Sequence, residues 1–399
     1  MRLTGTQVAA IVAGGAIFAL VFGARQSLAL FVGNINSATG LGLAAVSLAF
    51  AWAQLMWGVT QPLAGALADK FGAARVIAAG AVLVCIGTLV TPYARSTPML
   101  ILAVGVVAAG GAGMAGLGVL MSAVAHRLPV ERRGLASGLV NAGGSFGQFA
   151  VVPAAQALAG AVGWIGAVSG LALVALAAAP LAWLLRGKPA AAPAGGSGTL
   201  SAALAAAGRD RNYLMLGAGF FVCGFHVAFI GVHLPGVVAS CMLPAEVGAW
   251  SLSMVGLFNI LGSFAAGWAI GRWRMKSVLA GLYASRAIAV IVFLAMPKTA
   301  TTVLVFSAVI GFTYLATVPP TIGLVGKLHG LRYLATLFGV IMLVHQVGGF
   351  VGAWLGGRVF EATGSYDWVW YVDIVLATGA AIIHLPIREA HPAPRPVAA

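Results

Sequence analysis

The chain has 399 residues, of which 61% are hydrophobic and only 8% are charged. A soluble domain carries about 25% charged residues, so this composition excludes a soluble globular protein. The net charge of +14 does not indicate nucleic-acid binding. Lys and Arg lie in short segments between apolar runs and form no basic helix or aromatic-basic stripe.

Twelve apolar segments follow one another along the chain, each close to the about 20 residues that one bilayer crossing requires. They predict an all-α membrane protein with twelve transmembrane helices. Residues 7–32 are long enough to be the first span rather than a removed signal sequence. In chain order, the spans are expected near 7–32, 43–66, 75–94, 98–125, 134–158, 163–185, 212–236, 247–270, 277–296, 300–325, 333–358 and 367–387.

The Lys and Arg residues predict the orientation of these spans. With the N-terminus inside, 17 of the 22 lie in inside segments, 3 lie in outside loops, and Arg25 and Arg286 lie within spans. Cytoplasmic loops of membrane proteins carry the excess of positive charge. Both termini and the central linker are therefore expected on the cytoplasmic side of a cell (inner) membrane.

The spans form two six-helix halves that repeat one another. Residues 187–210, rich in Ala, Gly, Pro and Ser, predict a cytoplasmic linker between bundles at 1–186 and 211–388, with 389–399 as a disordered cytoplasmic tail. Three short stretches recur at an offset of six helices, as in alternating-access carriers. They are Phe22-Gly23-Ala24-Arg25 with Cys223-Gly224-Phe225-His226, Gly143–Gly147 with Gly348–Gly352, and Gly65 with Gly267.

The loop between spans 2 and 3 carries the sequence Gly-Ala-Leu-Ala-Asp-Lys-Phe-Gly-Ala-Ala-Arg over residues 65–75. It resembles the signature of the major facilitator superfamily, which implies two pseudo-symmetric six-helix bundles and a latch between them on the cytoplasmic side. The resemblance assigns the latch to Gly65, Asp69, Lys70, Gly72 and Arg75, with the Asp favoured near a helix N-terminus. In the second half Gly271 takes the Asp position, so only the first latch is expected.

Residues 128–138, Leu-Pro-Val-Glu-Arg-Arg-Gly-Leu-Ala-Ser-Gly, are followed by Gly143, Gly144 and Gly147. This stretch is similar to the span 4–5 signature of the monocarboxylate and oxalate/formate transporter group. The resemblance implies a small organic anion as the substrate. Arg132 and Arg133 of this stretch are expected to join the cytoplasmic latch.

Arg25 is the candidate anion-binding cation. Span 1 of monocarboxylate carriers has a cation shortly after a Phe, and Phe22-Gly23-Ala24-Arg25 is similar. Independently, a guanidinium in hydrocarbon costs at least about 2.5–3.5 kcal/mol and usually faces a wet cavity with a partner. Its planar donors fit a carboxylate in bidentate fashion. The alternative is that Arg25, two turns from the outer end of its span, snorkels to the lipid headgroups.

The sequence departs from the monocarboxylate pattern in span 8, where Asn259 and Ser263 take the places of an Asp and an Arg. Asp373 is the only acidic residue that falls deep in a span, so proton coupling through the usual carboxylate is not expected. A histidine can replace it, with His226, His233 and His345 as candidates, or the substrate acid can carry the proton. No carboxylate accompanies these histidines in the sequence, so neither a metal site nor a cofactor is predicted.

Further polar residues are assigned by family topology, in which spans 1, 4, 7 and 10 line the cavity and spans 2, 5, 8 and 11 lie beside them. The resulting substrate-binding candidates are Phe22, Arg25, Asn141, Gln148, His226, Asn259, Tyr314, His345 and Gln346. Arg286, in the peripheral span 9, is expected to have a structural partner such as Tyr283 or a facing amide. Pro319-Pro320 predicts a gating or packing kink in span 10.

The favoured function is secondary transport of a small organic anion by rocker-switch alternating access, coupled to protons or a counter-anion. The glycine-rich faces of spans 5 and 11 are expected to slide against the opposite half. The alternative is an efflux carrier for amphipathic or neutral compounds, with Phe22, Trp57, Phe220 and Phe221 in its cavity. A scaffold or receptor has no need for the latch, and no acid/base pair or nucleophile indicates an enzyme. The expected partners are a small-molecule substrate and the lipid bilayer. Nucleic acid is not an expected partner, and the protein is expected to be a monomer.

Overall fold

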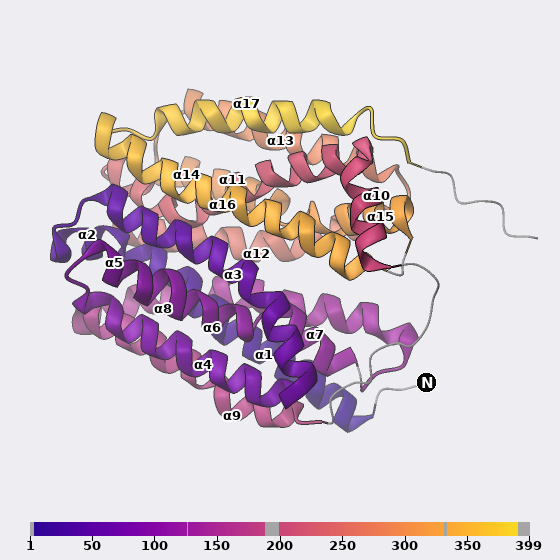
Figure 1. Cartoon of the computed structure of the whole chain (residues 1–399). Helices are drawn as coiled ribbons and strands as arrows, with labels where there is room; N and C mark the ends of the chain where they lie inside the picture. Colours follow the sequence, from indigo (N-terminus) through magenta and orange to yellow (C-terminus); the bar gives the residue numbers. More distant parts are fainter. Residues whose placement is uncertain (1–3, 126, 188–198, 331–332, 390–399) are drawn as a thin grey trace, which may run out of the picture.

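The computed structural model describes residues 4–125, 127–187, 199–330 and 333–389, and these residues form helices joined by short turns, without strands. Figure 1 shows the helices gathered into two halves, the N-terminal half in indigo to magenta and the C-terminal half in pink to yellow. The first turn of α1 (Gly5–Ser27), the helix α10 (Leu200–Arg209) and the last turn of α17 (Asp367–His384) lie at one end of the molecule, here called the linker end.

The N-terminal half begins with α1, which continues through the short η1 and α2 at the end opposite the linker. The fourth crossing is assembled from α5, the π-helical η3, α6 and α7. The bounds are α1 (Gly5–Ser27), η1 (Leu28–Phe31), α2 (Val32–Thr39), α3 (Leu43–Phe71), α4 (Ala73–Val90), η2 (Thr91–Tyr93), α5 (Thr97–Leu100), η3 (Ile101–Ala108), α6 (Ala109–Met114), α7 (Leu117–Ala125), α8 (Val130–Leu176), α9 (Ala178–Ala182) and η4 (Trp183–Leu185).

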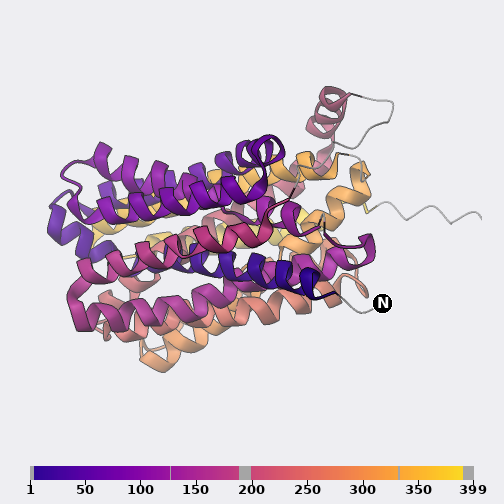
Figure 2. The ribbon, with the colours of Figure 1, turned by 90° about the horizontal axis from the view of Figure 1, so that it is seen from below.

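The C-terminal half is preceded by α10, a short helix of the predicted linker that lies at the linker end (Figures 1 and 2). Glu389, the first residue of the predicted tail, accepts a hydrogen bond from the Lys276 backbone amide at 2.9 Å; residues 188–198 and 390–399 lie outside the described residues. The bounds are α10 (Leu200–Arg209), α11 (Arg211–Ser240), α12 (Ala245–Ala269), α13 (Met275–Ala295), α14 (Ala300–Thr313), α15 (Val318–His329), α16 (Leu334–Thr363) and α17 (Asp367–His384).

Twelve crossings result from these helices. Ten stretches of the described chain are long and apolar enough to span a bilayer. One of them, Ala136–Leu185, supplies two crossings because α8 turns back at Gly163, whose φ of 78° lies in the region that favours glycine. The helix α17 supplies the last crossing. The predicted all-α membrane fold is confirmed.

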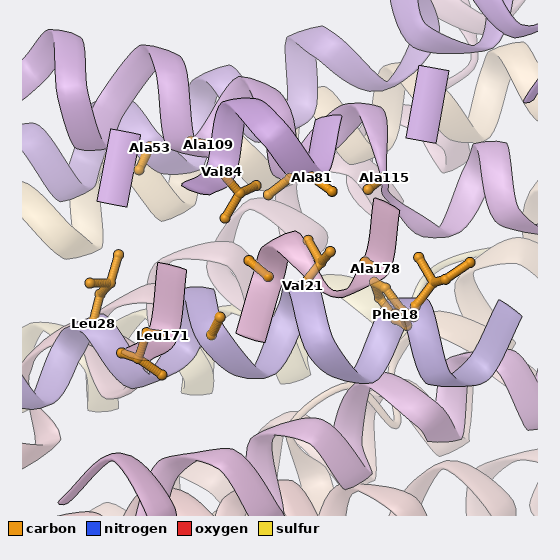
Figure 3. Packing of buried hydrophobic residues seen from close by; sticks show 14 of the residues in the cluster. Phe18, Val21, Leu28, Ala53, Ala81, Val84, Ala109, Ala115, Leu171 and Ala178 are labelled. Carbon is orange, nitrogen blue, oxygen red and sulfur yellow. The ribbon is translucent and has the colours of Figure 1, made fainter. Parts of the chain in front are cut away.

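Small side chains let the helices pack closely inside the N-terminal half. Figure 3 shows Ala81, Ala109, Ala115 and Ala178 among Phe18 and other larger side chains of neighbouring helices. Short side chains reduce the distance between helix axes, which favours packing in a membrane, where lipid tails compete for apolar contact.

The repeated glycines of spans 5 and 11 pack within their own halves. A Cβ on Gly143 or Gly147 of α8 would overlap backbone atoms of Gly15 or Ala19 in α1. Likewise, a Cβ on Gly348 or Gly352 of α16 would overlap the backbone of α11 at Phe221 or Phe225. The expectation that these glycine faces slide against the opposite half is therefore wrong for these four positions. They hold each half together by direct backbone contact.

The two halves meet along α3 with α16 and along α8 with α12. At the end opposite the linker, Glu361 of α16 accepts a hydrogen bond from the Ala44 amide of α3. Nearer the middle, Gly349 of α16 lies beside Gln54 of α3. Gly58 of α3 has no side chain, and Gln346 of α16 fills the space beside it. Further towards the linker, Gly65 of α3 and Gly339 of α16 have no neighbour within 4 Å of a Cβ position. The hydrogen bonds between these helix pairs in the described part of the chain, Ala44–Glu361, Gln148–Leu252, Phe149–Ser253 and Ser145–Asn259, lie in the middle of the molecule and at the end opposite the linker.

Candidate functional site

Arg25 in the last turn of α1 places its guanidinium inside the protein. Nη2 donates to Gln54 Oε1 of α3 at 2.8 Å, and Nη1 donates to Gln26 Oε1 at 3.1 Å. The guanidinium carbon lies 4.8 Å from the centre of the Trp57 ring, a cation–π arrangement. These three partners solvate the cation without neutralising it, because no carboxylate of the described chain forms an ion pair with Arg25.

A small cavity lies around this cation. Its polar lining consists of Arg25, Gln26, Gln54 and Thr88, and the rest is apolar, including Phe50, Val84 and Val104. Gly231 and Val232 of α11 complete the wall from the C-terminal half. The side chain of Arg25 therefore faces a cavity between the halves, and the snorkelling alternative is contradicted.

Tyr314 connects this cavity to the C-terminal half. Its hydroxyl donates to the Val227 carbonyl of α11 at 2.8 Å and interacts with the side chain of Gln26. A Cβ on Gly231 would lie 3.1 Å from the Tyr314 hydroxyl, so the absence of a side chain at Gly231 leaves the room through which Tyr314 reaches α1. The structure thus brings the predicted residues Arg25 and Tyr314 to one site.

The tenth crossing is broken beside Tyr314. The helix α14 ends at Thr313 and α15 begins at Val318. Pro319 and Pro320 lack the backbone N–H groups that would continue the hydrogen-bond ladder. The amide of Leu315, left open by this break, donates to Asn259 Oδ1 of α12 at 3.0 Å. The predicted kink is therefore an interruption of the helix, and Asn259 of a neighbouring helix satisfies the free backbone amide within it.

Arg286 satisfies the carbonyl side of the same break. Its Nη2 donates to the carbonyl oxygens of Thr313 and Tyr314, at 2.7 Å for Tyr314, and its side chain is fully buried. These carbonyls end α14, and the C-terminal end of a helix favours a cation. The ring of Tyr283 lies 5.2 Å from the guanidinium carbon. The expected contact with Tyr283 is present, and backbone carbonyls take the place of the expected amide.

Asn259 and Gln148 join the halves instead of facing the Arg25 cavity. Asn259 Nδ2 donates to Ser145 Oγ of α8 at 2.8 Å, and Gln148 Nε2 donates to the Leu252 carbonyl of α12 at 3.0 Å. Gln346 is buried against Gly58 at the α3–α16 contact. These three of the four predicted amides therefore lie at the interface across which the halves would move.

Phe22, Asn141 and His345 occupy three different surroundings. Phe22 packs within the N-terminal half, with its ring centre 6.1 Å from that of Trp57. The side chain of Asn141 is half-buried on α8. His345 is buried inside the C-terminal half, with its ring centre 4.8 Å from that of Phe220.

His226 pairs with a carboxylate. Its Nδ1 lies 2.7 Å and 3.0 Å from the two carboxylate oxygens of Asp373 in α17. The prediction that no carboxylate accompanies the histidines is wrong, because helices 147 residues apart in sequence become neighbours. His233 instead has Nε2 at 2.7 Å from the Ala353 carbonyl.

The predicted latch lies at the linker end. Asp69 and Lys70 are exposed at the end of α3, Gly72 has a φ of 88° between α3 and α4, and Arg75 is exposed in the first turn of α4. In the part of the chain that is described, Asp69 forms no ion pair within 4.0 Å. The side chains of Arg132 and Arg133 lie outside the described residues.

Gln26, Gln54 and Gly231 of this cavity are absent from the candidates predicted from sequence. The adjacency of Gln26 to Arg25 was the available signal for the first. A helical pattern does not tell which amide of span 2 faces span 1, so Gln54 could not be separated from Gln61 by spacing alone.

Comparisons with known proteins agree with this architecture. A family model described as Major Facilitator Superfamily matches residues 14–352. Monocarboxylate transporter 13 of Rattus norvegicus is 27% identical over 379 residues, which cover 92% of this chain and 86% of the relative. An oxalate:formate antiporter of Oxalobacter formigenes is 31% identical over 137 residues, covering 34% of this chain and 32% of the relative.

Two solved structures show the same fold. A bacterial homologue of the human lysosomal transporter Spinster, in an inward-facing and occupied conformation, superposes with a TM-score of 0.73 at 15% identity, covering 96% of this chain and 97% of that structure. A D-xylose-proton symporter superposes with a TM-score of 0.71 at 14% identity, covering 96% and 98%. Since the family model covers most of the sequence and the relatives with assigned functions are transporters, the chain belongs to the Major Facilitator Superfamily and is a multi-pass membrane transporter.

Proposed function

We propose that this transporter carries a small organic anion of the monocarboxylate type, with Arg25 as the group that pairs with the substrate carboxylate. The observation that supports the proposal most is the uncompensated charge of Arg25 beside a cavity between the halves. In a low-dielectric site such a charge attracts an anion strongly. The names of the relatives, monocarboxylate transporters and an oxalate:formate antiporter, support the same substrate class.

In this proposal the anion exchanges the amide oxygens of Gln26 and Gln54 for its own carboxylate oxygens on Arg25. A guanidinium can hold a carboxylate through two parallel N–H···O bonds, a geometry that an amide oxygen cannot match. The Tyr314 hydroxyl interacts with the side chain of Gln26, so it belongs to the same site. The apolar lining by Phe50, Val84 and Val104 suits a short carbon chain behind the carboxylate.

The transport cycle we propose is a rocker switch between bundles 1–186 and 211–388 of a monomer. The contacts of α3 with α16 near Ala44 would open as those near Asp69 close, which exposes Arg25 to alternate sides. The linker, both termini and the latch would lie on the cytoplasmic side of a cell (inner) membrane. The structure then corresponds to the state with contacts on the outer side.

The test is uptake by purified protein in liposomes, with radiolabelled formate, acetate and oxalate as probes. We expect Arg25→Ala to lower the uptake of the accepted anion by about a hundredfold, as expected for losing a desolvated charge pair. Arg95→Ala, which removes an exposed arginine, is the matched control. Undiminished uptake by Arg25→Ala would exclude the anion role of Arg25.

The second candidate function is efflux of amphipathic or neutral compounds. The apolar wall of the cavity and the Phe22–Trp57 pair favour it. In that case the purified protein would accept none of the three anions, and lipophilic dyes would be exported from cells equally by the wild type and by Arg25→Ala.

A further inference from the structure

A buried ionisable pair, His226–Asp373, lies outside the Arg25 cavity. The imidazole belongs to α11 and the carboxylate to α17, and their side chains are 1% and 0% exposed. Neither residue lines the cavity around Arg25. An ionisable pair at such a position in a membrane protein is expensive to bury, and such groups commonly serve the movement of ions or protons.

The charged group beside the pair is Arg286 of α13, whose charge interacts with that of Asp373. Around Arg286 lie Cys223 on α11, Tyr283 on α13 and the Tyr314 carbonyl between α14 and α15. Beyond them, His345 on α16 interacts with Cys223, and His384 on α17 stacks on Tyr283. Among them Arg286 is the fixed positive charge. Its positive charge near Asp373 favours the ionised carboxylate, although the two groups form no ion pair within 4.0 Å among the described residues.

The geometry leaves one nitrogen of His226 available. Because Nδ1 faces the Asp373 carboxylate at 2.7 Å, the stable arrangement has a hydrogen on Nδ1 that it donates to the carboxylate. In the neutral ring Nε2 then carries a lone pair. This atom is buried and has no hydrogen-bond partner in the described part of the chain. A carboxylate behind an imidazole fixes this tautomer and stabilises the imidazolium when Nε2 is protonated.

We propose that His226 and Asp373 form a proton-binding site in the C-terminal half, in which Nε2 of His226 takes up one proton and releases it once per transport cycle. The proton comes from water on one side of the membrane and returns to water on the other. The N–H bond at Nε2 is the only bond formed and broken, and Asp373 stays ionised. The inference rests on the proposed function. One proton accompanies one monocarboxylate bound at Arg25, so no net charge crosses the membrane.

The helix α11 couples the two sites. His226 precedes Val227, whose carbonyl accepts the Tyr314 hydroxyl, and Gly231 and Val232 of the same helix line the Arg25 cavity. A change in charge at His226 therefore acts on the helix that forms one wall of the anion cavity. This position also accounts for the missing acidic residue at position 259 of span 8, since the proton site lies on spans 7 and 12.

The first test measures proton-driven accumulation in liposomes, using whichever of formate, acetate and oxalate the wild type accepts and subtracting protein-free liposomes. One proton per anion in a gradient of about one pH unit allows about tenfold accumulation, because one unit corresponds to about 1.36 kcal/mol. We expect His226→Gln and Asp373→Asn to lose this accumulation, yet to exchange labelled for unlabelled anion within about twofold of the wild-type rate. Accumulation retained by both variants would overturn the proposal.

Two matched variants control for position. His233→Gln removes the other histidine of α11, whose ring hydrogen-bonds the Ala353 carbonyl and packs against Phe229 and Tyr366. Asp367→Asn removes an exposed carboxylate of α17. Both are expected to accumulate the anion as the wild type does. Loss of accumulation in both controls would show that the effect is not specific to the pair and would overturn the assignment.

The second test needs no substrate and separates the two proposals. In nitrogen-15 histidine NMR of the full chain in nanodiscs, the His226 signal is identified by its loss in His226→Gln. We expect the Nε2 signal to move between its unprotonated and protonated positions when the pH of the sample is changed, and proton binding at Nε2 to be weaker in Asp373→Asn because the carboxylate charge is removed. A His226 that stays in one protonation state in the wild type overturns the proton site. Absence of carboxylate uptake by the wild type would overturn the proposed function alone.

Discussion

Glu361 in the last turns of α16 accepts a hydrogen bond from the backbone amide of Ala44 in the first turn of α3, over 2.6 Å. The carboxylate belongs to one half and the helix N-terminus to the other. A helix N-terminus carries unpaired N–H groups and partial positive charge, so it favours a carboxylate. This contact joins the two halves at the end opposite the linker.

Glu361→Gln should weaken this closure. The amide keeps the acceptor oxygen but loses the charge, which near a helix N-terminus is worth about 0.3–1 kcal/mol, so the closed population should fall by less than about tenfold. Double electron–electron resonance between spin labels at exposed positions of the two halves would measure the change in the distance between the halves. Glu246→Gln, an exposed carboxylate in the first turn of α12, is the control and should leave the distances unchanged.

Arg25→Lys should lower anion transport although the positive charge remains. An ammonium is a point charge and cannot donate two parallel hydrogen bonds to a carboxylate, as a guanidinium does. We expect the KM for the accepted anion to rise by about tenfold, since one of the two charge-assisted hydrogen bonds is lost and such a bond is worth about 1.5 kcal/mol or more. The measurement is initial uptake over a range of anion concentrations. An unchanged KM would show that only the charge of Arg25 matters.

Parts of this architecture follow from sequence because hydrophobicity is local. A run such as 212–236 predicts a membrane helix without knowledge of its neighbours, and the structure has α11 over Arg211–Ser240. The break of the tenth crossing was likewise indicated by Pro319 and Pro320. Such features depend on the backbone chemistry of adjacent residues.

Pairings between distant helices do not follow from sequence in this way. His226 and Asp373 are 147 residues apart, and nothing near either residue marks the other as its partner. The glycine faces of spans 5 and 11 were expected to slide against the opposite half, and the structure instead packs them against α1 and α11 of their own halves. Which helix they approach depends on the rotation of the bundle, and the periodicity of one helix does not contain that information.

Arg286→Leu should destabilise the C-terminal half. The substitution leaves the carbonyls of Thr313 and Tyr314 unpaired in a buried site and leaves Asp373 without its compensating cation. Each unpaired buried group costs about 1–3 kcal/mol. We expect a fall of several degrees in the melting temperature in detergent, measured by fluorescence-detected gel filtration after heating. Arg272→Leu, which removes an exposed arginine stacked on Trp268, should melt within about one degree of the wild type. Equal melting of Arg286→Leu and the wild type would contradict the structural role.

Gly147→Leu should disrupt the N-terminal half itself, because Gly147 lies against the backbone of Ala19 in α1. The added side chain has to separate α1 from α8, and forced overpacking typically costs about 1–3 kcal/mol. Gly379→Leu on α17 is the matched control, since no atom lies within 4 Å of its Cβ position. The yield of monodisperse protein and its melting temperature are the measurements, and both should fall only in Gly147→Leu. If Gly147 instead faced a sliding surface between the halves, the variant would fold and melt as the wild type does and would lose only transport. The two outcomes thus distinguish packing inside a rigid half from movement between halves.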